Sequence, residues 1–187
     1  MAAIRKDTTF AAKIKTMTDI LNQFDPITLD EMKAIRLMNR IDTKFVTTVP
    51  MLRRLLSLAK DQYFVQEQGG LRISPYYTLY FDTEDCKMYN RHEAGHLARQ
   101  KVRVRSYLNA GLNFLEVKTK NNHGRTKKKR IEAQGFNPEN ISIFNVHSSM
   151  FSDFLQTYLQ YDQQALVSQV ENRFDRITLV NKGRTER

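Results

Sequence analysis

The chain has 187 residues, of which 41% are hydrophobic, which suits a single domain with a core of its own and a small extension. Its net charge of +10 indicates an acidic partner, such as nucleic acid, nucleotide, polyphosphate or an anionic membrane surface. The single cysteine, Cys86, excludes an intramolecular disulfide. No apolar run approaches the ~20 residues that span a bilayer. We therefore expect a cytoplasmic protein, and association with a membrane through a partner protein stays open.

The N-terminal part reads as helical. Apolar residues at three- and four-residue spacing predict an amphipathic helix over 10–24, which Pro26 ends. Thr28-Leu-Asp-Glu31 has the pattern of a capping box and predicts a second helix. We therefore expect residues 1–38 to form a helical extension and residues 39–187 to form the main domain.

Strands and short helices alternate through the next fifty residues. The sequence predicts a strand over 41–48 and a helix over 50–60, with Pro50 in its first turn. Residues 76–81 are aromatic and β-prone, which predicts another strand. A short helical or turn segment is expected over 82–95.

Two strands with cationic faces follow. Successive side chains of a strand point to opposite faces. Within Arg99–Tyr107 one face therefore carries Arg99, Lys101, Arg103, Arg105 and Tyr107, while valines occupy the other. Within Phe114–Lys120 one face carries Phe114, Glu116, Lys118 and Lys120. Asn109-Ala-Gly111 between the strands predicts a hairpin turn.

A third basic strand is predicted over 125–131, where alternate residues again divide into two sets. Either set can be a solvated strand edge, which resists aggregation, while the other joins a cationic surface. Residues 135–147 read as loop, Ser148 or Ser149 as the cap of a helix, and 166–180 as extended chain. The whole pattern is α+β, with antiparallel strands and helices gathered at the ends.

The cationic faces leave two interpretations open. In the plainer one the valines fill a core and the cations are solvated. In the other the cations line a cavity, where their desolvation costs several kcal/mol per ion unless an anion compensates. Arginine makes two-pronged contacts to phosphate oxygens, so a polyphosphate with a divalent metal ion is the partner that fits the cavity. No P-loop, nucleophile elbow or zinc-ligand spacing is present.

Several motifs in order carry a family resemblance. They are Arg40-x-Asp42-x-Lys44-Phe45, Tyr80-Phe81-Asp82-Thr83, Tyr89, His92, Gly95, Lys101-Val-Arg103-Val-Arg105-x-Tyr107, Phe114-Leu-Glu116-Val-Lys118-x-Lys120 and Gly124-Arg-Thr-Lys-Lys-Lys129-Arg130. From about residue 36 onward the chain resembles the VTC domain, named for the vacuolar transporter chaperone complex that makes inorganic polyphosphate. This family belongs to the triphosphate tunnel metalloenzymes.

The resemblance implies a fold, an activity and a site. The fold would be an antiparallel β-barrel with flanking helices and a basic lumen. The activity would be transfer of the γ-phosphate of ATP to a growing polyphosphate chain. Manganese or magnesium would assist this transfer. Catalytic positions would be Arg103, Arg105 and Lys118. Phosphate-binding positions would be Arg40, Lys44, Lys101, Lys120, Lys129 and Arg173. Metal ligands would include Asp42 and Glu116.

Two departures from the family pattern stand out. Glu171 occupies a place where the family usually has tyrosine. The pattern also continues past Arg187 with strands that carry the main metal-binding glutamate, so the resemblance implies a barrel that is incomplete at its C-terminal end.

Other functions remain open at this point. They are a tunnel triphosphatase, a non-catalytic module that binds polyphosphate or nucleotide and acts with a membrane-protein partner, and a nucleic-acid binder. We expect no nucleic acid, because the aromatic residues over 76–81 read as core rather than as a base-stacking platform.

Overall fold

The computed structural model describes residues 17–33, 35, 43–123 and 125–186. These residues form two compact units, one made of the chain up to Ser74 together with the residues from Arg176, and the other of Pro75–Asp175. Helices and strands occur in both, so the α+β class predicted from the sequence is confirmed.

The first unit contains a small sheet whose described strands are β1 (Asp25–Ile27), β2 (Tyr63–Gln66) and β8 (Leu179–Asn181), in the order β1-β2-β8. β1 pairs parallel to β2, and β8 pairs antiparallel to it. The helices of this unit include α2 (Leu29–Lys33) and α3 (Val49–Ala59), and residues 17–21 are also helical.

The predicted capping box is present, and a second cap, which the sequence analysis did not predict, begins α3. The Glu31 side chain accepts a hydrogen bond from the backbone N–H of Thr28, and the Thr28 hydroxyl accepts one from the N–H of Glu31. The Thr48 hydroxyl accepts from the N–H of Met51 at the start of α3. The strand predicted over 41–48 is wrong for 43–48, which have no regular secondary structure, and its first two residues lie outside the described residues.

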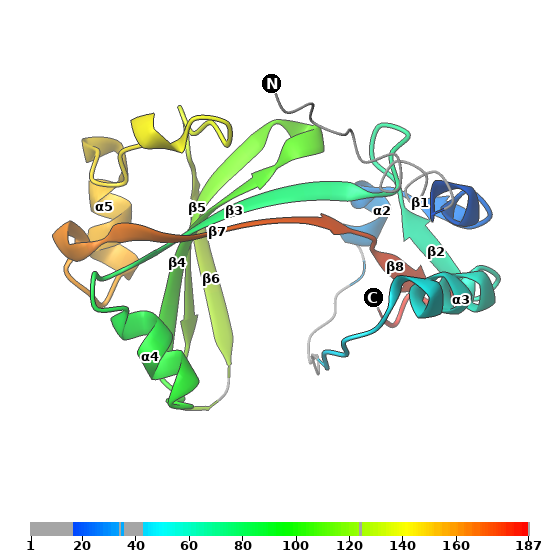
Figure 1. Cartoon of the computed structure of the whole chain (residues 1–187), viewed down its shortest axis with the longest axis horizontal. Helices are drawn as coiled ribbons and strands as arrows, with labels where there is room; N and C mark the ends of the chain where they lie inside the picture. Colours follow the sequence, from blue (N-terminus) through cyan, green and yellow to red (C-terminus); the bar gives the residue numbers. More distant parts are fainter. Residues whose placement is uncertain (1–16, 34, 36–42, 124, 187) are drawn as a thin grey trace, which may run out of the picture. The chain divides into compact units, whose positions relative to one another are not determined.

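The second unit is built on a larger sheet of described strands in the order β6-β5-β4-β3-β7 (Figure 1). Its elements are β3 (Ser74–Asp82), α4 (Lys87–Glu93), β4 (Arg99–Tyr107), β5 (Leu112–Lys120), β6 (Thr126–Glu132), α5 (Ser149–Tyr158) and β7 (Val167–Arg176). Neighbours from β3 through β6 pair antiparallel. The predicted strand segments and the helix capped by Ser148 are confirmed, since the Ser148 side chain accepts from the N–H of Met150.

The described strands do not close into a barrel. β6 and β7 lie at the two ends of the strand order, and each pairs with a neighbour on one side. The hairpin between β4 and β5 turns through a 3-10 helix (Leu108–Ala110) and Gly111, whose φ of 62° lies in the left-handed region that favours glycine. This turn fixes the register in which the two strands meet.

One face of the larger sheet packs on the core. Buried side chains from β3, β4 and β5, such as Tyr77, Val104 and Leu115, form a cluster with Phe151 and Leu155 of α5. Burial alternates strictly along β4, which confirms the predicted division of this strand into a core face and a cationic face. The cationic residues therefore stand on the side of the sheet opposite this core.

Candidate functional site

The cationic face of the larger sheet brings together side chains from four strands. Pairing places Arg103 opposite Tyr80 on one side and Glu116 on the other, and Glu116 opposite Arg130. Because side chains of directly paired residues share a face, the same alternation extends along each strand. The cationic face comprises Arg99, Lys101, Arg103, Arg105, Glu116, Lys118, Lys120, Lys128 and Arg130, with Tyr76, Thr78 and Tyr80 from β3.

A buried carboxylate lies at the centre of this face. The Glu116 side chain is 1% exposed, and one of its oxygens accepts a hydrogen bond from Arg103 Nε at 2.8 Å and forms an ion pair with Arg103 Nη2 at 2.7 Å. Its other oxygen contacts the Lys128 ammonium at 3.0 Å. Arg103 Nη1 also donates to the Tyr80 hydroxyl at 3.3 Å. One negative charge thus holds two cations in fixed positions.

The charges at this centre support one another. Burial opposes the ionisation of Glu116, but Arg103 and Lys128 outweigh burial and hold the pKa of Glu116 below its ordinary value. Burial likewise opposes the charge of Arg103, yet Glu116 more than compensates and raises the pKa of Arg103. Glu116 and Arg103 are therefore both charged at neutral pH.

Arg105 lies next to this cluster without the same compensation. Burial and the like charge of Arg103 outweigh the attraction of Glu116 and lower the pKa of Arg105. Its Nε donates to the Thr78 hydroxyl at 3.2 Å, and no carboxylate of the described residues forms an ion pair with it. A guanidinium in this setting favours an anion as its further partner.

Aromatic rings hold the flanking guanidinium groups. Arg105 lies over the rings of Tyr76 and Phe174, at 5.6 and 5.7 Å from their centroids. Those two rings stack on each other with centroids 5.2 Å apart. Arg130 lies over Phe114 at 4.2 Å. Such cation–π contacts orient the planar groups while leaving their N–H edges available.

The structure brings together most of the residues predicted from the sequence. Lys101, Arg103, Arg105, Glu116, Lys118 and Lys120 share the cationic face. Lys44 belongs to the other unit, whose position relative to this face is not described, and Arg40 and Asp42 lie outside the described residues.

Two predicted phosphate-binding residues lie on the core side of the sheet. Lys129 pairs with Val117, and its ammonium contacts the Tyr158 ring of α5 at 5.3 Å. Arg173 lies over the Tyr77 ring at 5.0 Å and hydrogen-bonds the Glu139 carboxylate. Neither side chain joins the cluster around Glu116.

The sequence analysis assigned no binding role to several residues on or beside this face. Lys128 and Arg130 belong to the other alternate set of β6, and the alternation itself does not say which set faces Glu116. Tyr80 was named only within a family motif, and Phe174 lay within a stretch predicted as extended chain. The signal that assigns them is the pairing register between strands, which a single sequence does not contain.

The described residues do not supply a metal site. No three His, Cys, Asp or Glu side chains come together among them. Glu116 was predicted as a metal ligand, but both of its oxygens already contact cationic side chains. A metal ion there would have to displace Arg103 or Lys128, so we assign no step to a metal ion.

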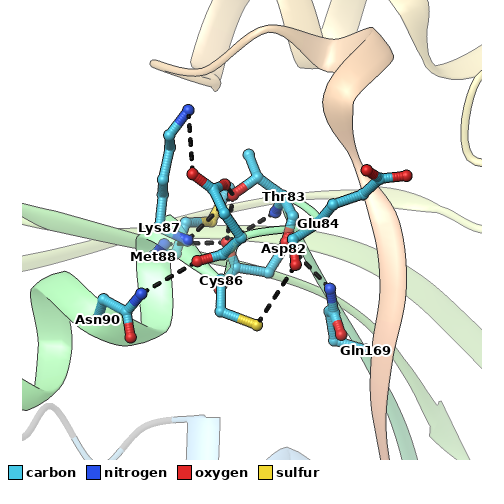
Figure 2. Close-up of polar contacts among 9 residues, drawn as sticks. Asp82, Thr83, Glu84, Cys86, Lys87, Met88, Asn90 and Gln169 are labelled. Atoms are coloured by element: carbon cyan, nitrogen blue, oxygen red, sulfur yellow. Dashed lines mark hydrogen bonds and ion pairs between the residues drawn. The ribbon is translucent and has the colours of Figure 1, made fainter.

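At one end of the face, α4 begins in a tight turn that two polar side chains organise (Figure 2). The buried Asp82 carboxylate accepts from the N–H groups of Thr83, Met88 and Tyr89 at 2.8–2.9 Å. The Thr83 hydroxyl accepts from the N–H of Lys87 and donates to Asp85. Cys86 precedes the helix with a φ of 55°.

The face can hold a phosphate chain in a way that a solvated lysine patch cannot. Arg103 is 17% exposed and is fixed by a carboxylate, and Arg105 is fixed by a hydroxyl and two rings. Fixed, partly desolvated cations bind anions without first ordering their own side chains. Chemically, the arrangement can orient successive phosphates and stabilise negative charge on them.

The sequence model of the VTC domain family matches residues 39–187. Comparison with curated proteins gives no match. No helix in the described parts of the chain has the length and apolar character to cross a membrane.

Proposed function

Since this chain belongs to the VTC domain family, we propose that its cationic face binds the phosphate groups of ATP and inorganic polyphosphate. The observation that carries the proposal is the environment of Arg105. Its guanidinium is partly buried, lies beside a second arginine, and has no carboxylate partner among the described residues. A phosphate oxygen would supply the missing negative charge.

The family supports a more specific proposal. In it, Arg103, Arg105 and Lys118 orient the γ-phosphate of ATP for transfer to a growing polyphosphate chain, while Lys101 and Lys120 hold neighbouring phosphates. Phosphoryl transfer depends mainly on positioning and on stabilising charge on the equatorial oxygens. The contacts of Arg103 and Arg105 provide fixed positive charge of this kind. Magnesium or manganese would accompany ATP as part of the substrate.

Binding is tested first with inorganic tripolyphosphate, by calorimetric titration. Arg105→Ala should weaken binding by about 10- to 100-fold, the value of one charged hydrogen-bonded contact. The matched control is Arg54→Ala on α3, which lowers the net charge equally at an exposed position of the other unit. Equal losses in both variants would mean that net charge alone attracts the anion, and the proposed site would be wrong.

Turnover is tested with ATP in the presence of magnesium or manganese. Polyphosphate visible on a stained gel supports polymerisation, whereas free phosphate without polymer supports a triphosphatase.

The engagement of both Glu116 oxygens favours a second candidate, a module that binds polyphosphate without catalysis and acts with a membrane-protein partner. Tight tripolyphosphate binding with neither product supports that candidate.

A further inference from the structure

A cavity of about 420 Å³ adjoins the cationic face within Pro75–Asp175, between α4 and the neighbouring parts of β3, β4 and β7. Small-molecule sites typically measure about 300–1,000 Å³, so this volume is large enough for a ring system. Its lining includes Tyr80, Met88, Tyr89, His92, Lys101 and Val170. Most of the lining is aromatic or apolar, and its polar side chains include Lys101, Asp82 and Gln169.

The cavity and the cationic face share two residues, Tyr80 and Lys101. Tyr80 lines the cavity, and its hydroxyl accepts the hydrogen bond from Arg103. Lys101 also lines it and stands two residues before Arg103 on the same face of β4, roughly 6.5–7 Å along the strand. A ligand whose phosphates contact Arg103 and Lys101 therefore has its next group at the mouth of the cavity.

The walls suit a flat heteroaromatic ring. Tyr89 is 58% exposed and offers its ring to the cavity, whereas Met88 is 3% exposed and forms part of the core beneath it. The Nδ1 atom of His92 is buried without a hydrogen-bond partner among the described residues. Burial, followed by the charges of Lys101 and Arg99, lowers the pKa of His92, which favours the neutral imidazole.

We propose that this cavity receives the aromatic base of a nucleoside triphosphate whose phosphates lie on the cationic face. The proposal rests on the proposed function and deepens it, because it assigns a place to the nucleoside, which inorganic polyphosphate lacks. It also sets a direction for the substrate. The base lies at the α4 end, the first phosphate lies near Lys101, and the terminal phosphate lies toward Arg105.

The test compares ATP with inorganic tripolyphosphate, which carries three phosphates and no nucleoside. Tyr89→Ala removes one wall of the cavity at an exposed position, and Val170→Trp, also exposed, fills the cavity from β7. The matched control is Tyr158→Ala, which removes a 37% exposed tyrosine on the core side of the sheet. Titration calorimetry on the full chain gives both dissociation constants for each variant.

Each outcome separates the base site from the phosphate site. Tyr89→Ala should weaken ATP binding by about 5- to 150-fold, the range for one base–aromatic contact, and leave tripolyphosphate binding unchanged. Val170→Trp should act in the same direction, and Tyr158→Ala should change neither ligand. Equal effects on both ligands, or none, would overturn the base site while tripolyphosphate binding keeps the proposed function intact. If the unaltered protein binds neither ligand, both proposals are wrong.

Discussion

Glu116 shows how a single buried residue can organise a positively charged surface. Its carboxylate compensates two cations, and this allows Arg103 to be 17% exposed without a large desolvation penalty. The same contacts leave Arg105 as the neighbouring cation that lacks a carboxylate contact in the described part of the chain. The residue thus stabilises the free protein and directs where an anion is most favourable.

Glu116→Gln should lower the free energy of unfolding by about 3 kcal/mol at pH 7, because it leaves a buried guanidinium uncompensated. Tripolyphosphate should restore part of this loss by supplying the missing negative charge. Urea unfolding with and without the ligand measures both effects. Glu132→Gln, at an exposed position of β6, is the control and should change stability by no more than about 0.5 kcal/mol.

The effect of Glu116→Gln should depend on pH. In the folded protein the pKa of Glu116 lies below its ordinary value of 4.5. The ionised carboxylate therefore adds stability that is fully present above 4.5 and is lost as the pH falls through the lower, folded-state pKa. The difference between the original protein and the variant should accordingly narrow below pH 4.5. A difference that stays constant down to pH 3 would contradict the assigned charge state.

At the scale of the element, β6 shows that register decides function within a basic run. Its sequence, Thr-Lys-Lys-Lys-Arg-Ile-Glu, offers cations to both faces of the sheet. Pairing with β5 places Lys128 beside Glu116 and Lys129 beside the Tyr158 ring. A shift of one residue would exchange these roles.

Lys128 and Lys129 therefore form a matched pair for testing the register. Lys128→Ala should weaken tripolyphosphate binding by about tenfold, since it removes a cation of the face and frees one oxygen of Glu116. Lys129→Ala should leave the affinity nearly unchanged, although both variants lose one charge from neighbouring positions. A larger loss with Lys129→Ala, measured by the same titration, would mean that β6 pairs in the alternative register.

The start of α4 is a second element whose order depends on one side chain. Asp82→Ala should lower the free energy of unfolding by about 2 kcal/mol, because three backbone N–H groups lose their acceptor. Hydrogen exchange should show faster exchange of the Met88 and Tyr89 amides. Asp153→Asn on α5, an exposed position, serves as the control. Unchanged protection of both amides in Asp82→Ala would show that the cap does not hold this turn.

At the scale of the whole molecule, the net charge of +10 is only partly concentrated in the site. The cationic face gathers eight basic residues around one carboxylate, and other cations, such as Arg54 and Lys129, lie elsewhere. Net charge attracts any polyanion, whereas the fixed guanidinium groups of Arg103 and Arg105 favour closely spaced phosphates. The proposed binding of polyphosphate therefore predicts a preference for short phosphate chains over nucleic acid.

Salt and competition distinguish the two partners. Tripolyphosphate should displace a fluorescent duplex DNA from the protein at stoichiometric concentration, and the DNA should bind measurably only at low salt. Raising the salt from 50 to 200 mM should weaken DNA binding by about 1,000-fold or more if six or more phosphates are contacted. DNA that resists displacement by tripolyphosphate in a polarisation assay would favour nucleic acid instead.

Local patterns in the sequence predicted local structure well. The alternation of Arg99–Tyr107 predicted β4 and its two faces, and the capping patterns at Thr28 and Ser148 predicted the starts of helices. Short-range hydrogen bonds and side-chain periodicity determine these features, and both are visible in a single sequence.

Long-range pairing could not be predicted in the same way. β1 and β8 have three residues each and owe their existence to β2, which comes from a distant part of the chain. The order β6-β5-β4-β3-β7, the set of β6 that meets Glu116, and the open form of the described sheet all follow from contacts between strands. The cavity beside α4 likewise arises where three strands and a helix meet.

The backbone conformation of Cys86 lowers the stability of the turn that precedes α4. A φ of 55° places a non-glycine residue in the left-handed region, at a cost of roughly 1–2 kcal/mol. Cys86→Gly should therefore raise the free energy of unfolding by about 1 kcal/mol, which thermal unfolding measures. A decrease would mean that the contacts of the Cys86 side chain outweigh the backbone strain. The turn that forms one wall of the cavity is thus a place where the chain gives up stability to hold a shape.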